Sequence, residues 1–429
     1  MDVKLTMEFP EYKELTSPQP MSLADAQSLL GSDEALVAYL GAEDRTFLWV
    51  VRKASAEMKR LDIGRNELTE AVAELRGGLD PVDVETVKDI PPFDTTKAFE
   101  IYQKIFAPAE PLLKGVRHVF VIPDGALQSL PLGVLVTEKP QGGFTDFSGY
   151  RQVPWLARKY AMTTLPSVSS LRALRRFAKA ARGSKPFGGF GDPLLKGHPD
   201  ERRGIELASL FKPRGIADVD AVRTRLAPLP DTAGELKAMA AILGAANDNL
   251  FLGERATERN AKTRDLSDYR VMAFATHGLV AGDLKGLAEP ALVLTPPRTG
   301  TKEDDGLLTA SEVAQLKLNA DLVVLSACNT AAADGTPGAE GLSGLAKAFF
   351  YAGSRSLLVS HWPVLSDAAV KLTTRMLKEA ANDNRIGRAE ALRRSMLALM
   401  EDAGKPHFAH PMFWAPFVVV GEGGTYAAN

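Results

Sequence analysis

Ala320-Asp-Leu-Val-Val-Leu-Ser-Ala-Cys-Asn-Thr330 opens as a short apolar, β-branched run and closes in small and polar residues. Such a run is typical of a strand that is buried on both faces of a parallel sheet. Cys328 follows the last strand position, and ligands and chemistry gather at the carboxyl ends of strands in open α/β sheets. This stretch therefore predicts a mostly parallel α/β sheet with Cys328 at its rim.

Cys328 is the single cysteine of the chain, so it cannot form an internal disulfide. Most lone cysteines are small buried hydrophobes, and the alternative is a reactive thiol. A second apolar run upstream, Arg270-Val-Met-Ala-Phe-Ala-Thr-His-Gly278, ends on His277 and a glycine. Cys328 follows His277 by 51 residues, close to the roughly 50 residues that separate histidine and nucleophile in caspases. We expect both side chains at one rim of the sheet.

This pair suits nucleophilic catalysis. The thiolate is the reactive form of cysteine, and a nearby histidine activates it by pairing with the thiolate or by taking the proton. Gly278 has no Cβ, so its backbone N–H can approach a substrate carbonyl closely, although a glycine there also permits a tight turn.

The composition is that of an ordinary globular protein, with 429 residues, 45% hydrophobic and 24% charged residues, and a net charge of −2. This charge balance favours neither nucleic acid nor a membrane surface as partner. One cysteine, no signal-peptide pattern and no apolar run of spanning length predict a cytoplasmic protein. We expect no metal and no cofactor.

The chain reads as an α/β protein with two halves. We predict an N-terminal arm or linker (1–30), an N-terminal α/β half (31–197), a catalytic half (198–421) and a short tail (422–429). Strands are expected at 35–40, 46–51, 118–122, 250–252, 291–295, 356–360 and 417–420, with helices at about 65–77, 95–106, 257–266, 341–352, 366–381 and 388–402. Strands that alternate with helices of this length indicate a mostly parallel sheet covered on both faces.

Two capping boxes mark predicted helix starts, Thr232-x-x-Glu235 and Thr309-x-x-Glu312. Ser366 is the predicted N-cap of the helix that carries Asp367 in its first turn. The glycine-rich run 187–193 lacks the Lys-Ser/Thr of a P-loop and the GxGxxG spacing, which makes an NTP-driven protein a remote alternative.

The motifs resemble those of the CHAT domain family, caspase-like cysteine peptidases that are distantly similar to separases, caspases and gingipains. The likeness runs in order from about residue 35 to residue 421. The segments that carry it are Ile122-Pro-Asp-Gly-Ala-Leu-Gln-Ser-Leu-Pro131, Leu229-Pro-Asp-Thr232, Ala275-Thr-His-Gly278, Leu325-Ser-Ala-Cys-Asn-Thr330, Gly341-Leu-Ser-Gly-Leu-Ala-Lys-Ala-Phe-Phe-Tyr-Ala-Gly353, Ser360-His-Trp-Pro-Val364 and Pro411-Met-Phe-Trp-Ala-Pro-Phe417.

The resemblance implies a caspase-like fold whose N-terminal half is a non-catalytic partner domain. It implies a cysteine endopeptidase with a His277–Cys328 dyad and an oxyanion hole made by the N–H groups of Gly278 and Cys328. The strand after the cysteine helix would line the substrate groove through Ser360, His361 and Trp362.

By resemblance to separases, Asp367 would pair with a basic P1 side chain, while the alternative is a favourable acid in the first turn of a helix. The resemblance also suggests a protein substrate, a regulatory helical-repeat region or activating partner, and bacterial defence. The alternative from another class is a catalytically silent scaffold in a regulatory complex, which the intact His-Gly and Ala-Cys-Asn motifs disfavour.

Overall fold

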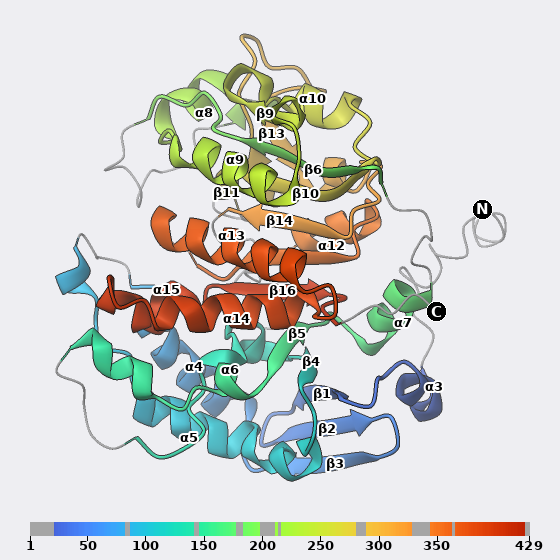
Figure 1. Ribbon diagram of the computed structural model, residues 1–429, viewed down its shortest axis with the longest axis vertical. Helices are drawn as coiled ribbons and strands as arrows, with labels where there is room; N and C mark the ends of the chain where they lie inside the picture. Colours follow the sequence, from blue (N-terminus) through green and yellow to red (C-terminus); the bar gives the residue numbers. More distant parts are fainter. Residues whose placement is uncertain are drawn as a thin grey trace. The chain divides into compact units, whose positions relative to one another are not determined.

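The chain forms two units, each built on its own run of mostly parallel strands (Figure 1). Unit 1 comprises residues 1–180 and 385–429, and unit 2 comprises residues 181–384. In this computed structural model the described residues are 21–81, 86–140, 146–176, 183–197, 211–212, 216–279, 289–327, 344–362 and 365–424.

Unit 1 is an α/β unit in which a hairpin extends a parallel core. Its strands run in the order β3-β2-β1-β4-β5-β16, and β1, β4, β5 and β16 pair in parallel. The strands are β1 (Glu34–Gly41), β2 (Thr46–Arg52), β3 (Ala56–Leu61), β4 (His118–Ile122), β5 (Ala161–Thr164) and β16 (Phe417–Gly421). The helices are α3 (Leu23–Ser28), α4 (Arg65–Leu79), α5 (Thr95–Ile105), α6 (Leu156–Lys159), α7 (Val168–Arg176), α14 (Arg388–Met400) and α15 (Pro411–Trp414).

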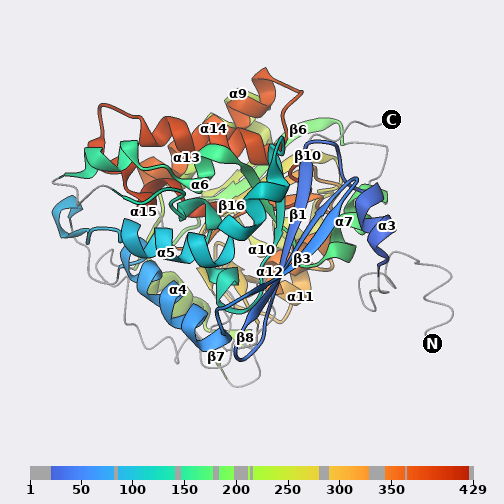
Figure 2. The same cartoon turned by 90° about the horizontal axis from the view of Figure 1, so that it is seen from below.

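The predicted strands 35–40 and 46–51 are confirmed by β1 and β2, which pair as an antiparallel hairpin up to Gly41 and Thr46, so the connection is 42–45. Strand β3 was not predicted. Most of its side chains are exposed, so it lacks the apolar pattern that marks the other strands. Figure 2 shows α4 and α5 beside each other in this unit.

The C-terminal segment completes unit 1. Strand β16 pairs with β5 at Val419 and Thr163, and α14 packs on β5, β16 and α6. In Figure 1 this red segment lies against the green and teal strands of unit 1. The grouping by contact thus differs from the contiguous 198–421 half of the sequence prediction, because β16 finds its partner strand near residue 163. The prediction that the halves have different functions remains a prediction.

A buried ion cluster ties distant parts of unit 1 together. Arg175 donates to Glu34 at 2.8 and 2.9 Å and to Glu422 at 2.7 and 3.2 Å. His118 lies beside them and contacts Thr163 through Nε2 at 2.7 Å. Burial raises the pKa of Glu34, but His118 and Arg175 outweigh it and hold that pKa well below its ordinary value.

Unit 2 carries the predicted motifs on a parallel sheet with the order β15-β14-β10-β6-β9. The sheet strands are β6 (Lys185–Gly191), β9 (Leu250–Leu252), β10 (Tyr269–Ala275), β14 (Leu322–Ser326) and β15 (Ser356–Ser360). The helices are α8 (Val219–Arg225), α9 (Asp231–Leu243), α10 (Glu258–Thr263), α11 (Ala310–Val313), α12 (Gly344–Tyr351) and α13 (Ser366–Asn382). Smaller sheets are formed by β7 (Phe211–Lys212) with β8 (Ile216–Ala217), and by β11 (Gly278–Leu279), β12 (Ala291–Val293) and β13 (Leu307–Thr309).

Helices cover both faces of this sheet, as predicted. On one face Phe274 of β10 stacks on Phe190 of β6 at 5.3 Å and meets Phe349 of α12, also at 5.3 Å. On the other face α9 packs so closely that a Cβ at Gly189 would lie 2.8 Å from Leu236. Gly189 and Gly191 of the run 187–193 therefore allow the close packing of α9 on β6, which ends at Gly191.

Two local predictions differ from the structure. Helix α9 begins after Pro230 without a side-chain cap, because Thr232 is already helical and Glu235 turns to the buried face. Helix α13 begins after Leu365, so Ser366 is its first residue rather than its N-cap. The capping box of Thr309 and Glu312 is confirmed. Among the described residues, no helix has the length and apolar character needed to cross a bilayer.

Candidate active site

The ends of β10 and β14 define the candidate site. These strands are parallel neighbours, and their register pairs Ala275 with Ser326. His277 and Cys328 each follow this last pair by two residues. Cys328 itself lies outside the described residues, so the predicted dyad stays a prediction.

The ring of His277 is oriented by a backbone carbonyl. Its Nε2 lies 2.8 Å from the carbonyl oxygen of Ala227. Because a carbonyl only accepts, Nε2 carries the proton, and the lone pair of the neutral ring is on Nδ1. The ring can therefore take a proton through Nδ1 while Nε2 stays bonded. Sequence reasoning missed Ala227, since a backbone acceptor leaves no side-chain signal.

A small hydrophobic cluster holds that carbonyl in place. Leu226 and Leu279, the chain neighbours of Ala227 and Gly278, belong to one buried cluster with residues of α8, β12 and β13. The Leu226 carbonyl also accepts from the N–H of Gly197 at 2.9 Å. The same packing thus fixes both the histidine segment and its acceptor.

Gly278 begins β11 and pairs with Leu292 of β12. The neighbouring Val293 donates its N–H to the His277 carbonyl at 2.9 Å, which makes His277 and Val293 the hydrogen-bonded pair of this ladder. Antiparallel pairs alternate, so Gly278 and Leu292 form a non-hydrogen-bonded pair. The Gly278 N–H therefore points away from β12, and Thr276 fastens the segment by donating its hydroxyl to the Val293 carbonyl.

The predicted substrate-binding residues at the end of β15 and directly after it are buried. Ser360 is 2% exposed and donates its hydroxyl to the carbonyl of Ala327 at 2.8 Å, one residue before Cys328. His361 is 6% exposed and Trp362 is fully buried. Direct contact of these two rings with a peptide would require a change of conformation, and their role in binding stays a prediction.

Asp367 lies in the first turn of α13 and is exposed. Its position suits both interpretations, the favourable acid of a first turn and a carboxylate that meets a basic side chain. The specificity role of Asp367 stays a prediction.

Glu235 is a residue of this site that sequence reasoning misread. It is 3% exposed, and its carboxyl lies 3.1 Å from the hydroxyl of Ser326 and 3.0 Å from that of Thr373. Burial raises the pKa of Glu235 to about 7, against the lowering effect of the two hydroxyls. A buried carboxyl that titrates near neutral pH beside the end of β14 is a common mark of functional sites.

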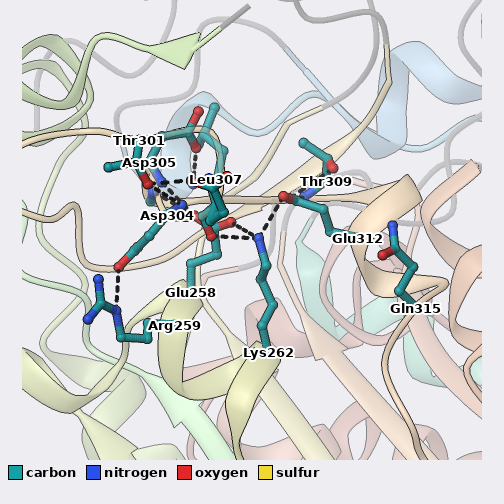
Figure 3. Close-up of polar contacts among 12 residues, drawn as sticks. Glu258, Arg259, Lys262, Thr301, Asp304, Asp305, Leu307, Thr309, Glu312 and Gln315 are labelled. Carbon is teal, nitrogen blue, oxygen red and sulfur yellow. Dashed lines mark hydrogen bonds and ion pairs between the residues drawn. The ribbon is translucent and has the colours of Figure 1, made fainter.

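A second buried carboxyl in unit 2 supports a loop (Figure 3). Glu258 accepts the N–H groups of Asp305 and Gly306 at 2.7 and 2.9 Å and the Lys262 ammonium at 2.8 Å. Lys262 also donates to Glu312 at 2.8 Å. Asp305 and Gly306 belong to the loop between β12 and β13, and Glu258 and Lys262 belong to α10. The network therefore anchors this loop on α10.

Fold and site together define an α/β protein with a parallel sheet and a backbone-oriented histidine at a strand end. Residues 95–422 match the family model described as the CHAT domain, which is well over half of the chain. The chain belongs to the CHAT domain family, as its motifs predicted.

Two curated proteins resemble parts of this chain. Tetratricopeptide repeat protein 28 of Mus musculus is 32% identical over 115 residues, or 27% of this chain and 4% of that protein. The Homo sapiens protein of the same name is 23% identical over 332 residues, or 71% of this chain and 12% of that protein. The chain thus spans only a small part of the length of these relatives.

Similar solved structures include two kinds of protein. Separase in the Saccharomyces cerevisiae separase–securin complex gives a TM-score of 0.49 at 11% identity, covering 98% of this chain and 31% of that chain. Gingipain R, an Arg-specific cysteine proteinase, gives a TM-score of 0.40 at 11% identity, covering 84% of this chain and 75% of that chain. Likeness at this level assigns no activity.

Proposed function

We propose that this chain is a cysteine endopeptidase that cleaves a protein substrate through a His277–Cys328 dyad. The observation that carries the proposal is the 2.8 Å bond from His277 Nε2 to the Ala227 carbonyl at the end of β10. This bond leaves Nδ1 to accept a proton, on the strand end that neighbours β14.

The chemistry follows that of thiol acyl transfer. His277 takes the proton of the Cys328 thiol, and the thiolate attacks the scissile carbonyl carbon. The oxyanion that forms is stabilised by the N–H groups of Gly278 and Cys328. The C–N bond then breaks, His277 gives its proton to the leaving amine, and water hydrolyses the thioester.

The family relation also supports a proposal about control. The curated relatives are named for tetratricopeptide repeats and are far longer than this chain. We infer that a helical-repeat region or another activating protein regulates the site. The same relation keeps open the second candidate, a catalytically silent scaffold in a regulatory or defence complex, because the names of these relatives mention no peptidase.

Active-site labelling tests the proposal. Peptidyl acyloxymethyl ketones with P1 Arg and with P1 Leu are compared on the wild type, Cys328→Ala and His277→Ala by mass spectrometry. We expect labelling at Cys328 that falls by about 100-fold or more without His277, the range of general-base contributions. A preference for P1 Arg that is lost in Asp367→Asn would assign the specificity role. Absence of labelling, also after addition of cell lysate, favours the scaffold.

A further inference from the structure

Two hydroxyl contacts fasten the chain just before Cys328. Ser326, the last residue of β14, donates its hydroxyl to Glu235 at 3.1 Å, and the Ala327 carbonyl accepts from Ser360 at 2.8 Å. Glu235 continues the first connection to α13 through Thr373 at 3.0 Å. One buried carboxyl therefore joins the end of the nucleophile strand to the helix that begins with Ser366 and Asp367.

We propose that Glu235 is a positioning residue of the candidate active site, which holds the end of β14 against α13 through Ser326 and Thr373. The inference rests on the proposed function for its catalytic meaning. Glu235 itself is not placed in contact with the substrate, so it acts through the residues that precede Cys328.

The hydrogen bonds around Thr373 show which protonation state fits this geometry. Its hydroxyl lies 2.9 Å from the carbonyl of Ala369 and 3.0 Å from Glu235. A hydroxyl has one proton, so when Thr373 donates to Ala369 it must accept from Glu235. A protonated Glu235 satisfies the whole chain of bonds. An ionised Glu235 accepts a hydrogen bond from the Thr373 hydroxyl instead. The Ala369 carbonyl then loses its hydrogen bond from that hydroxyl.

Among the described residues, the side chains that bond to Glu235 are the uncharged Ser326 and Thr373. On α13 the neighbours of Thr373 one turn away are uncharged, namely Ala369, Val370, Met376 and Leu377. The last residues of β6, β9, β10 and β14 are uncharged, while Asp192 follows β6 and donates its N–H to Thr232 of α9. On α9 itself Asp231 and Lys237 are exposed. The pKa of the Glu235 carboxyl is raised by burial and lowered by the hydroxyls of Thr373 and Ser326. The other titratable groups of the candidate site among the described residues are His277 and Asp367.

The experiment uses the single cysteine as a reporter that needs no peptidase activity. The rate of Cys328 alkylation by iodoacetamide is measured from pH 5 to 10 for the wild type, Glu235→Gln and Glu235→Leu, with Glu258→Gln as a matched buried control. An ionised Glu235 puts a negative charge beside Ser326, two residues before Cys328 in the chain, and a negative charge disfavours a neighbouring thiolate. Both Glu235 variants should therefore move the midpoint to lower pH by about one pH unit, and the control should not.

The rate of labelling by the peptidyl ketone then distinguishes the effect of the Glu235 hydrogen bonds from the effect of its charge. Glutamine can keep both hydroxyl contacts, so we expect Glu235→Gln to retain most of the maximal rate of labelling that is reached at high pH. For Glu235→Leu we expect this maximal rate to fall by about tenfold. An unmoved midpoint, or equal loss in both variants, would overturn the inference. Thr373→Val is a second variant if Glu235→Leu does not fold, with the same expected loss. If the ketone labels no variant, the endopeptidase proposal fails, while the alkylation profiles still test Glu235.

Discussion

Glu34 in unit 1 and Glu235 in unit 2 are both almost fully buried, with exposures of 7% and 3%, but their surroundings are opposite. Glu34 faces the guanidinium of Arg175 and the ring of His118, and its pKa is lowered. Glu235 faces the hydroxyls of Ser326 and Thr373, and its pKa is raised to about 7. The carboxyl of Glu34 stays charged at neutral pH, whereas the carboxyl of Glu235 is close to the midpoint between its protonated and ionised forms.

This difference in surroundings distinguishes a buried carboxylate that stabilises the fold from a buried carboxyl to which we assign a role in the candidate site. An ion cluster joins α7, β1 and the residue after β16, so its value is to hold the fold of unit 1 together. A carboxyl without a cation stabilises little at neutral pH and tolerates a change of charge. Glu235 stands next to the end of β14, where the proposal gives its position and its titration a role.

The largest effect is expected from Arg175→Met. This change leaves Glu34 and Glu422 buried without their shared cation, and breaking a buried pair in this way costs about 3–5 kcal/mol of unfolding free energy. Urea unfolding at pH 7 measures it. A loss below about 1 kcal/mol would mean that the cluster is not the anchor of unit 1.

An intermediate effect is expected for Glu235→Gln, and it depends on pH. Because the folded-state pKa of Glu235 is raised from 4.5 to about 7, its favourable contribution is present below pH 4.5 and is lost as pH rises through 7. The loss is on the order of 3 kcal/mol.

Glutamine does not titrate, so the variant should gain stability relative to the wild type between pH 5 and 8. Glu34 has the opposite sign, since its contribution is present above pH 4.5 and disappears as pH falls below that value. Urea unfolding of the wild type and Glu235→Gln across pH 4.5 to 8, where the Glu34 contribution stays constant, isolates the slope that is due to Glu235. Parallel curves for wild type and Glu235→Gln would contradict the raised pKa.

The smallest effect is expected for Arg117→Met. Arg117 pairs with Asp33 at 2.6 Å, but its side chain is 84% exposed, so water and salt screen the interaction. We expect a change of less than about 1 kcal/mol in unfolding free energy at pH 7. This variant controls for loss of an arginine, and a loss equal to that of Arg175→Met would show that burial is not the cause.

The sequence alone determined the fold class, most strand and helix positions, and the family. Apolar runs such as 322–326 mark buried strands, and the His-Gly and Ala-Cys-Asn motifs follow two of them directly. These signals are local in the chain, which explains why they can be recognised without coordinates. The exposed strand β3 escaped because its stability comes from pairing with β2 rather than from its own pattern.

Only the tertiary structure decided how the site is supported. It showed the return of β16 to unit 1, the Ala227 carbonyl on His277 and the burial of Glu235. Thr232 and Glu235 have the spacing of a capping box, yet the packing of α9 on the sheet turns Glu235 inward, toward Ser326 and Thr373. A local motif specifies which bonds a side chain can make, and packing against distant elements selects the one it does make.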